Sequence, residues 1–384
     1  MKTNPNLPGL YVHVPFCRSK CHYCDFYSIT APNRIPQYLK ALGYEIDLIS
    51  NEWSDFETVY IGGGTPGYLQ LNALQLLFDK LSRLIIGDIT EYTVELNPEN
   101  VTHEMLDLLS VNGVNRISLG IQTFDDSILT FLGRSHTSKT TQIALEIIGK
   151  HTDLQVSTDM IFGYPNHTSK KMETDLKRLI EYQPDHISCY QLTIEPGTRF
   201  AKEVRLGQIR LPSNDDQYDL FMAYSEFLTK NGYTHYEISN YASDTTAICR
   251  HNMKYWRREP YLGLGPSAHS FLQNRRWWNP KSIQRYSEKL MAGKSPSQAE
   301  ETITTEMEMI ERIYLGARTN DGIPKELLES CPIARDNILK FKEDGFLTEE
   351  NTHWKLTPRG FAVADGMIEM VLRSCFYQVK VNYD

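Results

Sequence analysis

The stretch YVHVPFCRSKCHYC, residues 11–24, contains three of the seven cysteines in this chain of 384 residues. It opens with a short strand-like run, and Cys17, Cys21 and Cys24 follow that run directly. Three thiolates on one short loop can bind three irons of a cubane cluster and leave the fourth iron open to a ligand. The stretch therefore predicts an iron–sulfur cluster just after the first strand of the fold.

A structural zinc ion is the alternative for these cysteines, with His22 completing a Cys3His ligand set. Structural zinc sites usually combine two well-separated pairs of ligands, and this sequence offers no second pair. The four remaining cysteines stand alone, at Cys189, Cys249, Cys331 and Cys375. The spacing therefore favours iron–sulfur over zinc.

The first 230 residues alternate short apolar or β-branched runs with longer amphipathic runs. The predicted strands are residues 10–14, 58–61, 92–96, 116–120, 155–161 and 186–192, and helix-like segments such as 35–49, 139–148 and 215–230 lie between or after them. Such alternation implies parallel strands with helices outside. Glycines and polar residues follow several different strands, as in barrel enzymes, whereas an open doubly wound sheet, the alternative, concentrates its site at one switch point. The sequence predicts an α/β fold with a partial (β/α)6 barrel similar to the TIM barrel.

Three segments are expected along the chain. Residues 1–232 form the barrel, and residues 233–300, rich in aromatic residues, Gly and His, close it. Residues 301–384 contain a helix, a short hairpin and a last helix, which predicts a small winged-helix-like α+β domain. Winged helices often bind DNA, but a net charge of −8 and a pI of about 5.8 argue against a nucleic acid partner.

Composition places the chain among ordinary globular proteins, with 41% hydrophobic and 23% charged residues. The start of the sequence lacks the apolar segment of a signal peptide, and no run of 18 apolar residues occurs. The odd number of cysteines does not suit a secreted disulfide framework. A reducing cytoplasm is the expected location.

Beyond these inferences, the spacing C-x3-C-x2-C resembles that of the radical S-adenosylmethionine (SAM) proteins. The strings GGGTP (62–66), GIQTFDD (120–126), LGRSH (132–136) and YQLTIEPGT (190–198) resemble one branch, the oxygen-independent coproporphyrinogen oxidases and their relatives. The likeness covers most of the chain, including the C-terminal segment. It implies a [4Fe–4S] cluster whose open iron chelates the amino and carboxylate groups of SAM.

The same resemblance implies the residues of the SAM site. The glycine turn lets backbone groups approach a ligand closely and contacts the methionyl amino group, through Gly63, Gly64 and Thr65. Tyr11 resembles the tyrosine beneath the cofactor, and Glu95 the acid that binds the methionine part or the ribose. From the residues alone, acids at strand ends fit salt bridges or helix caps equally well. The other expected cofactor-binding residues are Tyr23 and, around a second SAM, Gln122, Arg134 and Asp159.

Position 26 departs from the oxidase pattern. Oxidases of this type carry a further cysteine two positions after the third cluster ligand, whereas this chain has Phe26. The chain instead resembles the haem chaperone branch, in which a string HNxxYW, here residues 251–256, contains a histidine implicated in haem binding. His251 is therefore the expected haem ligand, with a hydrogen-bonded structural histidine as the alternative. His269, Trp277 and Trp278 are expected to shape the same cavity.

These features predict a haem chaperone that binds haem and delivers it to membrane-associated or soluble haemoproteins. In this interpretation the cluster and SAM regulate assembly or delivery, and the family suggests a homodimer that reaches the membrane during delivery. The alternative is an enzyme, oxygen-independent coproporphyrinogen III dehydrogenase, which converts two propionates to vinyls with two SAM molecules. The residues that resemble a second SAM site support this alternative, and another radical SAM reaction is a third.

Overall fold

A computed structural model describes residues 7–151, 153–328 and 331–376. Six parallel strands form the centre of the fold: β1 (Gly9–Val14), β2 (Thr58–Gly63), β3 (Glu91–Leu96), β4 (Arg116–Gln122), β5 (Gln155–Phe162) and β6 (His186–Gln191). The helices after them are α1 (Ile35–Ile49), α2 (Leu71–Leu81), α3 (His103–Val111), α4 (Asp126–Leu132), α5 (Ser138–Ile148), α6 (Ser169–Ile180), α7 (Arg199–Arg205) and α8 (Asn214–Lys230). All six predicted strands are present, but the sequence analysis missed the short helices α4 and α7.

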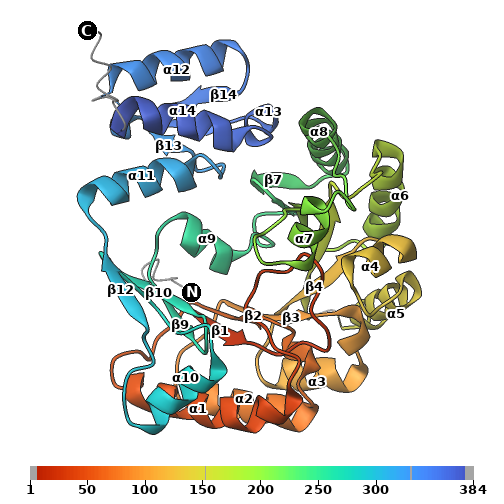
Figure 1. The fold of residues 1–384 in the computed structure, drawn as a ribbon, viewed down its shortest axis with the longest axis vertical. Helices are drawn as coiled ribbons and strands as arrows, with labels where there is room; N and C mark the ends of the chain where they lie inside the picture. The colour runs from red at the N-terminus through yellow and green to blue at the C-terminus, as the bar shows by residue number, and fades with distance from the viewer. Residues whose placement is uncertain (1–6, 152, 329–330, 377–384) are drawn as a thin grey trace.

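The six strands lie side by side in chain order, and each neighbouring pair is parallel. Each crossover therefore leads to the adjacent strand, and the helices lie outside the curved sheet (Figure 1). A doubly wound sheet would reverse the strand order and place helices on both faces. The partial barrel is confirmed, and the doubly wound alternative is wrong.

Local sequence determines where the outer helices begin. Five of them start after a Ser or Thr whose side-chain oxygen accepts a hydrogen bond from the backbone three residues later. These N-cap residues are Thr102, Thr137, Thr168, Thr198 and Ser213. Thr102 and Thr168 lie in strand-to-helix connections, so their caps also help to hold the loops at the carboxyl ends of β3 and β5.

The barrel is not closed by β1 and β6 pairing with each other. β1 pairs instead with β9, and β6 pairs with β8, so the sheet has twelve strands, and β12 and β7 are its two edge strands. The added strands are β7 (Thr234–Glu237), β8 (Asn240–Ala242), β9 (Tyr261–Leu264), β10 (His269–Leu272), β11 (Arg275–Trp278) and β12 (Ala299–Thr302). The segment that showed no helical period thus forms most of the antiparallel flanks, together with α9 (Arg250–Trp256) and α10 (Ile283–Met291).

Helix α9 covers the amino end of the barrel. Its residue His251 contacts Gly9 and Thr58, which are the first residues of β1 and β2. Glu91, the first residue of β3, accepts hydrogen bonds from the backbone N–H groups of Arg250 and His251, at 2.6 and 3.3 Å. An acid at a helix N-terminus stabilises that helix. The loops at the carboxyl ends of the strands therefore lie at the opposite end of the barrel from α9.

The C-terminal segment forms the expected small domain, visible in blue in Figure 1. Its three strands pair antiparallel in the order β13–β15–β14, the order of a winged helix, and a helix precedes the first strand. The elements are α11 (Thr305–Gly316), β13 (Ile323–Pro324), η4 (Lys325–Leu327), α12 (Pro332–Glu343), β14 (Leu347–Glu350), β15 (His353–Leu356), α13 (Pro358–Phe361) and α14 (Ala364–Phe376). The predicted single last helix is thus two helices.

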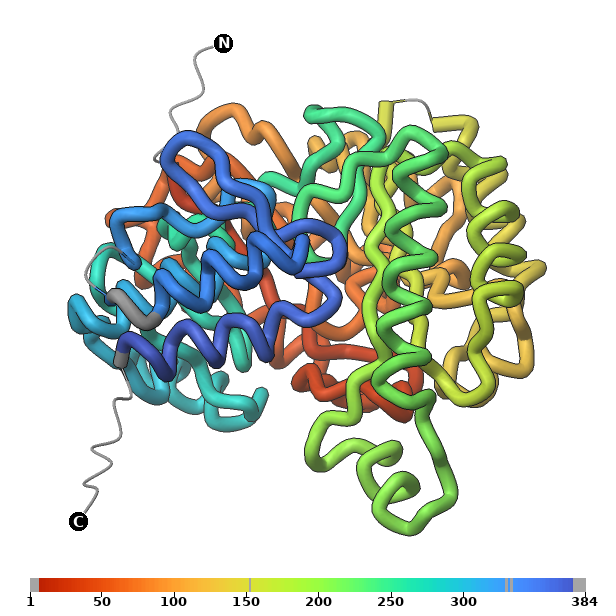
Figure 2. The backbone as a smooth tube through the Cα atoms, turned by 90° about the horizontal axis from the view of Figure 1, so that it is seen from above, coloured from red at the N-terminus to blue at the C-terminus, as the bar shows by residue number. Residues whose placement is uncertain are grey.

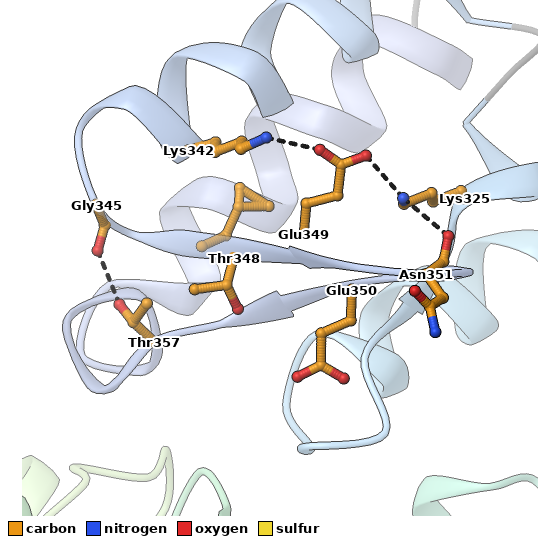
Figure 3. A pocket seen from close by; sticks show the side chains of 9 residues that line it. Lys325, Lys342, Gly345, Thr348, Glu349, Glu350, Asn351 and Thr357 are labelled. Carbon is orange, nitrogen blue, oxygen red and sulfur yellow. Dashed lines mark hydrogen bonds and ion pairs between the residues drawn. The ribbon is translucent and has the colours of Figure 1, made fainter.

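A surface pocket in this domain is organised by one acid. Glu349 on β14 forms ion pairs with Lys342 of α12 and Lys325 of η4, at 2.6 and 2.7 Å (Figure 3). The two ammonium groups lower the pKa of Glu349 to about 2. Exposed pairs of this kind stabilise little, so the pairs orient the hairpin without contributing much to folding.

No helix among the described residues combines the length and apolar character needed to cross a membrane.

A buried acid joins α1 to the β9 side of the sheet. Glu45 is 4% exposed, and its carboxyl group accepts hydrogen bonds from the Gly265 backbone N–H, Asn279 Nδ2 and the Tyr286 hydroxyl, at 2.8, 2.7 and 2.5 Å. Burial raises the pKa of Glu45, although the three donors oppose that shift. Because the donors come from the β9–β10 loop, the end of β11 and α10, Glu45 connects three separate parts of the chain.

We expect Tyr286→Phe to lower the free energy of unfolding by roughly 1–3 kcal/mol, because the buried carboxyl group loses one of its donors. Urea denaturation of the full chain measures this change. Tyr44→Phe, at an exposed position of α1, is the matched control and should change stability by less than about 0.5 kcal/mol. Equal stability of the two variants would show that the Glu45 network contributes nothing.

Candidate functional site

A cavity of about 580 Å³ occupies the interior of the barrel. Strands of six residues are roughly 20 Å long, and the cavity is lined by residues from both ends of them. At the carboxyl end it is lined by Cys17, Cys21 and Cys24, and at the amino end by Arg116, His186 and Asn252. All the predicted cofactor residues except Tyr11 and His251 line this one cavity.

The cysteine loop provides a donor set that fits a cubane cluster. Thr65 Oγ1 donates to Cys17 Sγ and Arg134 Nη1 donates to Cys21 Sγ, both at 3.6 Å. Burial raises the pKa of the Cys24 thiol to about 11, so deprotonation depends on bound iron, which deprotonates thiols outright. Among the described residues no three His, Cys, Asp or Glu side chains converge on a single ion, whereas a cubane distributes its thiolates over three irons.

His22 is not available as a zinc ligand. Its Nδ1 donates to the Phe131 carbonyl at 2.8 Å, and its Nε2 accepts from Arg199 Nη1 at 2.8 Å. Both ring nitrogens therefore bind protein groups outside the cysteine loop, and the Cys3His alternative is contradicted. Arg199 belongs to α7, whose segment projects beyond the barrel beside the cysteine loop (Figure 2).

The glycine turn is required by the protein's own packing. A Cβ on Gly63 would lie 2.3 Å from His13 Nδ1, and Gly63 has a φ of +105°, which favours glycine. A Cβ on Gly64 would lie 2.7 Å from the Phe16 carbonyl oxygen, and one on Gly62 would lie 2.6 Å from Glu95 Cδ. The turn therefore needs glycine before any ligand is considered, a reason that the sequence analysis did not supply.

Glu95 is the acid nearest this turn. Its carboxyl oxygens accept hydrogen bonds from the Gly63 backbone N–H at 3.0 Å and from the Tyr60 hydroxyl at 2.8 Å. Burial raises the pKa of Glu95 to about 7, so a neighbouring ammonium group would favour its ionised form. The sequence analysis missed Tyr60, whose position two residues before the turn could have indicated it.

Arg134 lies between the cysteine loop and the end of β4. Its Nη2 donates to Asn97 Oδ1 at 2.6 Å and to the Gly120 carbonyl at 2.9 Å, while Nη1 reaches Cys21. Protein groups therefore already occupy part of the guanidinium, and Asn97, which follows β3, is a positioning residue. Gln122 lines the cavity nearby, with a φ of +70° where the β4–β5 register shifts.

Asp159, Tyr23 and Tyr11 occupy different parts of the site. Asp159 accepts a hydrogen bond from Ser118 Oγ at 3.1 Å, and burial raises its pKa. Tyr23 lines the cavity, whereas Tyr11 lies behind it and donates its hydroxyl to His13 Nδ1 at 2.9 Å. Tyr11 is thus placed to support the wall of the cavity rather than to form its surface.

His251 lies outside the cavity, in the cover formed by α9. Its Nδ1 bonds to Thr58 Oγ1 and its Nε2 to the Tyr255 hydroxyl, both at 2.8 Å, and its ring stacks on Tyr60 with centroids 5.2 Å apart. The side chain is buried, which lowers its pKa to about 3 and keeps it neutral. Neither ring nitrogen is free to bind iron in this arrangement.

The other aromatic residues expected around His251 lie elsewhere. His269 and Trp278 stack on each other on β10 and β11, with centroids 5.7 Å apart. These two residues and Trp277 do not line the barrel cavity. They therefore do not contribute to the barrel cavity, because the segment after α9 forms the antiparallel flank of the sheet, and their place in a haem cavity stays a prediction.

The barrel, the cysteine loop and the glycine turn define a radical SAM protein. The sequence profile of the Radical SAM superfamily matches residues 11–179, and that of the HemN C-terminal domain matches residues 303–363. The solved structure of coproporphyrinogen III oxidase (HemN) from Escherichia coli, a radical SAM enzyme, superimposes with a TM-score of 0.81 at 21% identity, over 96% of this chain and 91% of that one. This likeness establishes the fold.

Sequence relatives identify the family more closely. The haem chaperone HemW of Lactococcus lactis is 31% identical over 97% of this chain and 98% of its own. The HemW proteins of Bacillus subtilis and Escherichia coli are 32% and 30% identical, over 83% and 95% of this chain and 86% and 98% of theirs. The chain therefore belongs to the HemW family, a family of radical SAM proteins whose curated members carry the name haem chaperone.

We expect His22→Ala to keep its full iron content and visible absorption after anaerobic reconstitution, because His22 bonds only to protein groups. Cys24→Ala should lose both, since a cubane needs three thiolates to leave a single iron open. Iron and zinc analysis of the two purified variants measures this. Stoichiometric zinc in the wild-type protein, lost in His22→Ala, would favour the Cys3His site instead.

Proposed function

We propose that this protein is a haem chaperone that carries haem and passes it to acceptor haemoproteins. The observation that carries the proposal is Phe26, which is 67% exposed at the edge of the cavity beside the cysteine loop. In the oxidases that the sequence resembles, a cysteine occupies this position, and a phenyl ring supplies neither a thiol nor a polar group. The names of the family members support haem as the cargo.

In this proposal Cys17, Cys21 and Cys24 hold a [4Fe–4S] cluster. When bound, the cluster would supply an open iron for SAM and one electron for its cleavage. The chain's own residues would hold the cofactor, because Glu95 and the backbone of the glycine turn present acceptors for the methionyl ammonium group. Nη1 of Arg134 points toward the cysteine loop, and Gln122 of β4 and Asp159 of β5 face the cavity.

The location and partners follow from the same proposal. We place the protein in the cytoplasm, and at the membrane surface during delivery to membrane-associated acceptors. In this proposal the protein also forms a homodimer and delivers haem to soluble acceptors. The barrel of residues 1–232 would hold the cofactors, residues 233–300 would extend its sheet and close its amino end through α9, and residues 301–384 would serve a structural or covering role. Glu349 and Glu350 on the wing hairpin oppose contact with a phosphate backbone, so a nucleic acid partner is not proposed.

His251 retains its proposed role as the haem ligand on one condition. Its Nε2 must first lose the hydrogen bond from Tyr255, which lies four residues later on the same helix. Rotation of the half-buried Tyr255 side chain alone would free that nitrogen, whereas Nδ1 would stay bonded to Thr58. A hydrogen bond at the second ring nitrogen orients a histidine that binds a metal.

Turnover separates the chaperone from the dehydrogenase. Reconstituted and reduced protein is given SAM and coproporphyrinogen III anaerobically, and one chromatographic run quantifies 5′-deoxyadenosine and every porphyrin. We expect no loss of carboxylates, and we expect haem loaded on the same preparation to transfer to an apo-haemoprotein. Stoichiometric conversion of propionates to vinyls over several turnovers would make the protein an oxidase despite Phe26.

Two variants of α9 test the haem ligand. His251→Ala should weaken haem binding by roughly tenfold or more, about 1.4 kcal/mol per tenfold, because an axial bond is lost. Tyr255→Phe should keep or strengthen binding, because Nε2 no longer needs to exchange partners. Absorbance titration measures both, with His269→Ala as the control at a site outside the cavity. An unchanged haem spectrum in His251→Ala would show that the ligand lies elsewhere.

A further inference from the structure

The amino end of the cavity contains a buried cation whose ion pair is too long for a hydrogen bond. Arg116, the first residue of β4, lines the cavity and is 2% exposed. Its Nη1 has no hydrogen-bond partner among the described residues, and the nearest carboxylate oxygen, of Glu91, lies 3.8 Å away. That distance is too long for a hydrogen bond. A buried charge of this kind is costly unless it is paired and hydrogen-bonded.

Glu91 mainly bonds to the start of α9 rather than to Arg116. Its oxygens accept from the backbone N–H groups of Arg250 and His251 and from the Cys249 thiol, at 2.6, 3.3 and 3.5 Å. These bonds hold the start of α9. Glu91 therefore attracts Arg116 by its charge but forms no pair of parallel hydrogen bonds with the guanidinium group. Guanidinium groups bind carboxylates best through two parallel hydrogen bonds.

The other groups around the amino end of the cavity are neutral or already bonded. Asp159 lies further along β5, where its charge interacts with that of Arg116, and it accepts hydrogen bonds from Ser118. His186 bonds to Ser157 at 2.7 Å and to the Tyr236 hydroxyl at 2.8 Å, and burial and the Arg116 charge lower its pKa so that the ring stays neutral. Arg116 is therefore the cation at this end of the cavity that has an unpaired donor.

We propose that Arg116 forms a subsite for an organic carboxylate at the amino end of the barrel cavity, a strand's length from the cysteine loop. The buried guanidinium donates to the carboxylate, and the amide of Asn252, which also lines this end, offers a further hydrogen bond. Two kinds of ligand carry such a carboxylate. One is a propionate of the carried haem, which rests on the proposed function, and the other is a small free carboxylate.

The test uses reconstituted full-length protein and three probes: haem, haem dimethyl ester and succinate. Absorbance titration measures binding of the haem probes, and calorimetry measures binding of succinate. We expect Arg116→Gln to weaken binding of haem or of succinate by roughly tenfold or more, while haem dimethyl ester binds unchanged. A loss restricted to haem identifies a propionate as the ligand, and a loss restricted to succinate identifies a free carboxylate.

Glu91→Gln tests the subsite from the opposite direction and covers the case in which Arg116→Gln does not fold. The amide oxygen can still accept from one of the two α9 backbone N–H groups, but the side chain carries no charge that competes for Arg116, so carboxylate binding should strengthen about threefold or more. Arg276→Gln, outside the cavity, is the matched control. Equal binding of haem and of succinate by wild type, Arg116→Gln and Glu91→Gln would overturn the proposal. If wild type binds succinate through Arg116 but does not bind haem, the haem chaperone proposal fails and the subsite stands.

Discussion

Parallel pairing of six strands in chain order is the constraint on which the rest of this structure depends. Because every crossover leads to the next strand, all six carboxyl ends meet at one end of the barrel, and all six amino ends meet at its other end. The cysteine loop, the glycine turn and the Arg134 loop come together only for that reason. The same constraint gives the cavity two chemically different ends, one with thiols and glycines and one with a buried arginine under α9.

Sequence patterns predicted those features that depend on local periodicity and spacing. The cysteine loop and the GGGTP turn were recognisable because their residues are consecutive, and the strands because they are short apolar runs. The position of His251 was not predictable, because it depends on the pairing of β1 with β9 and on the capping of α9 by Glu91. A motif in the sequence does not specify which end of a barrel it covers.

The barrel interior contains several charged groups with little exposure to solvent. Arg116 is buried, Glu95, Asp159 and Arg134 are half-buried, all four line the same cavity, and the pKa values of the two acids are raised. A well-packed apolar interior is often at least as stable, since burying charges costs free energy even when they are paired. The chain therefore gives up stability to maintain a polar chamber, and the folding energy comes from the apolar layer between the sheet and the outer helices.

The open barrel has a consequence for solubility. A free strand edge exposes unpaired backbone groups and invites association with other chains. At the β7 edge, the segment after α11 donates and accepts backbone hydrogen bonds, from Asn320 to Tyr236 and from Ile238 to Arg318, both at 2.9 Å. At the other edge, β12 presents Glu300 and Glu301, which pair with arginines of β11. The C-terminal domain thus covers one edge of the sheet, and its removal would expose the unpaired backbone of β7 to association with other chains.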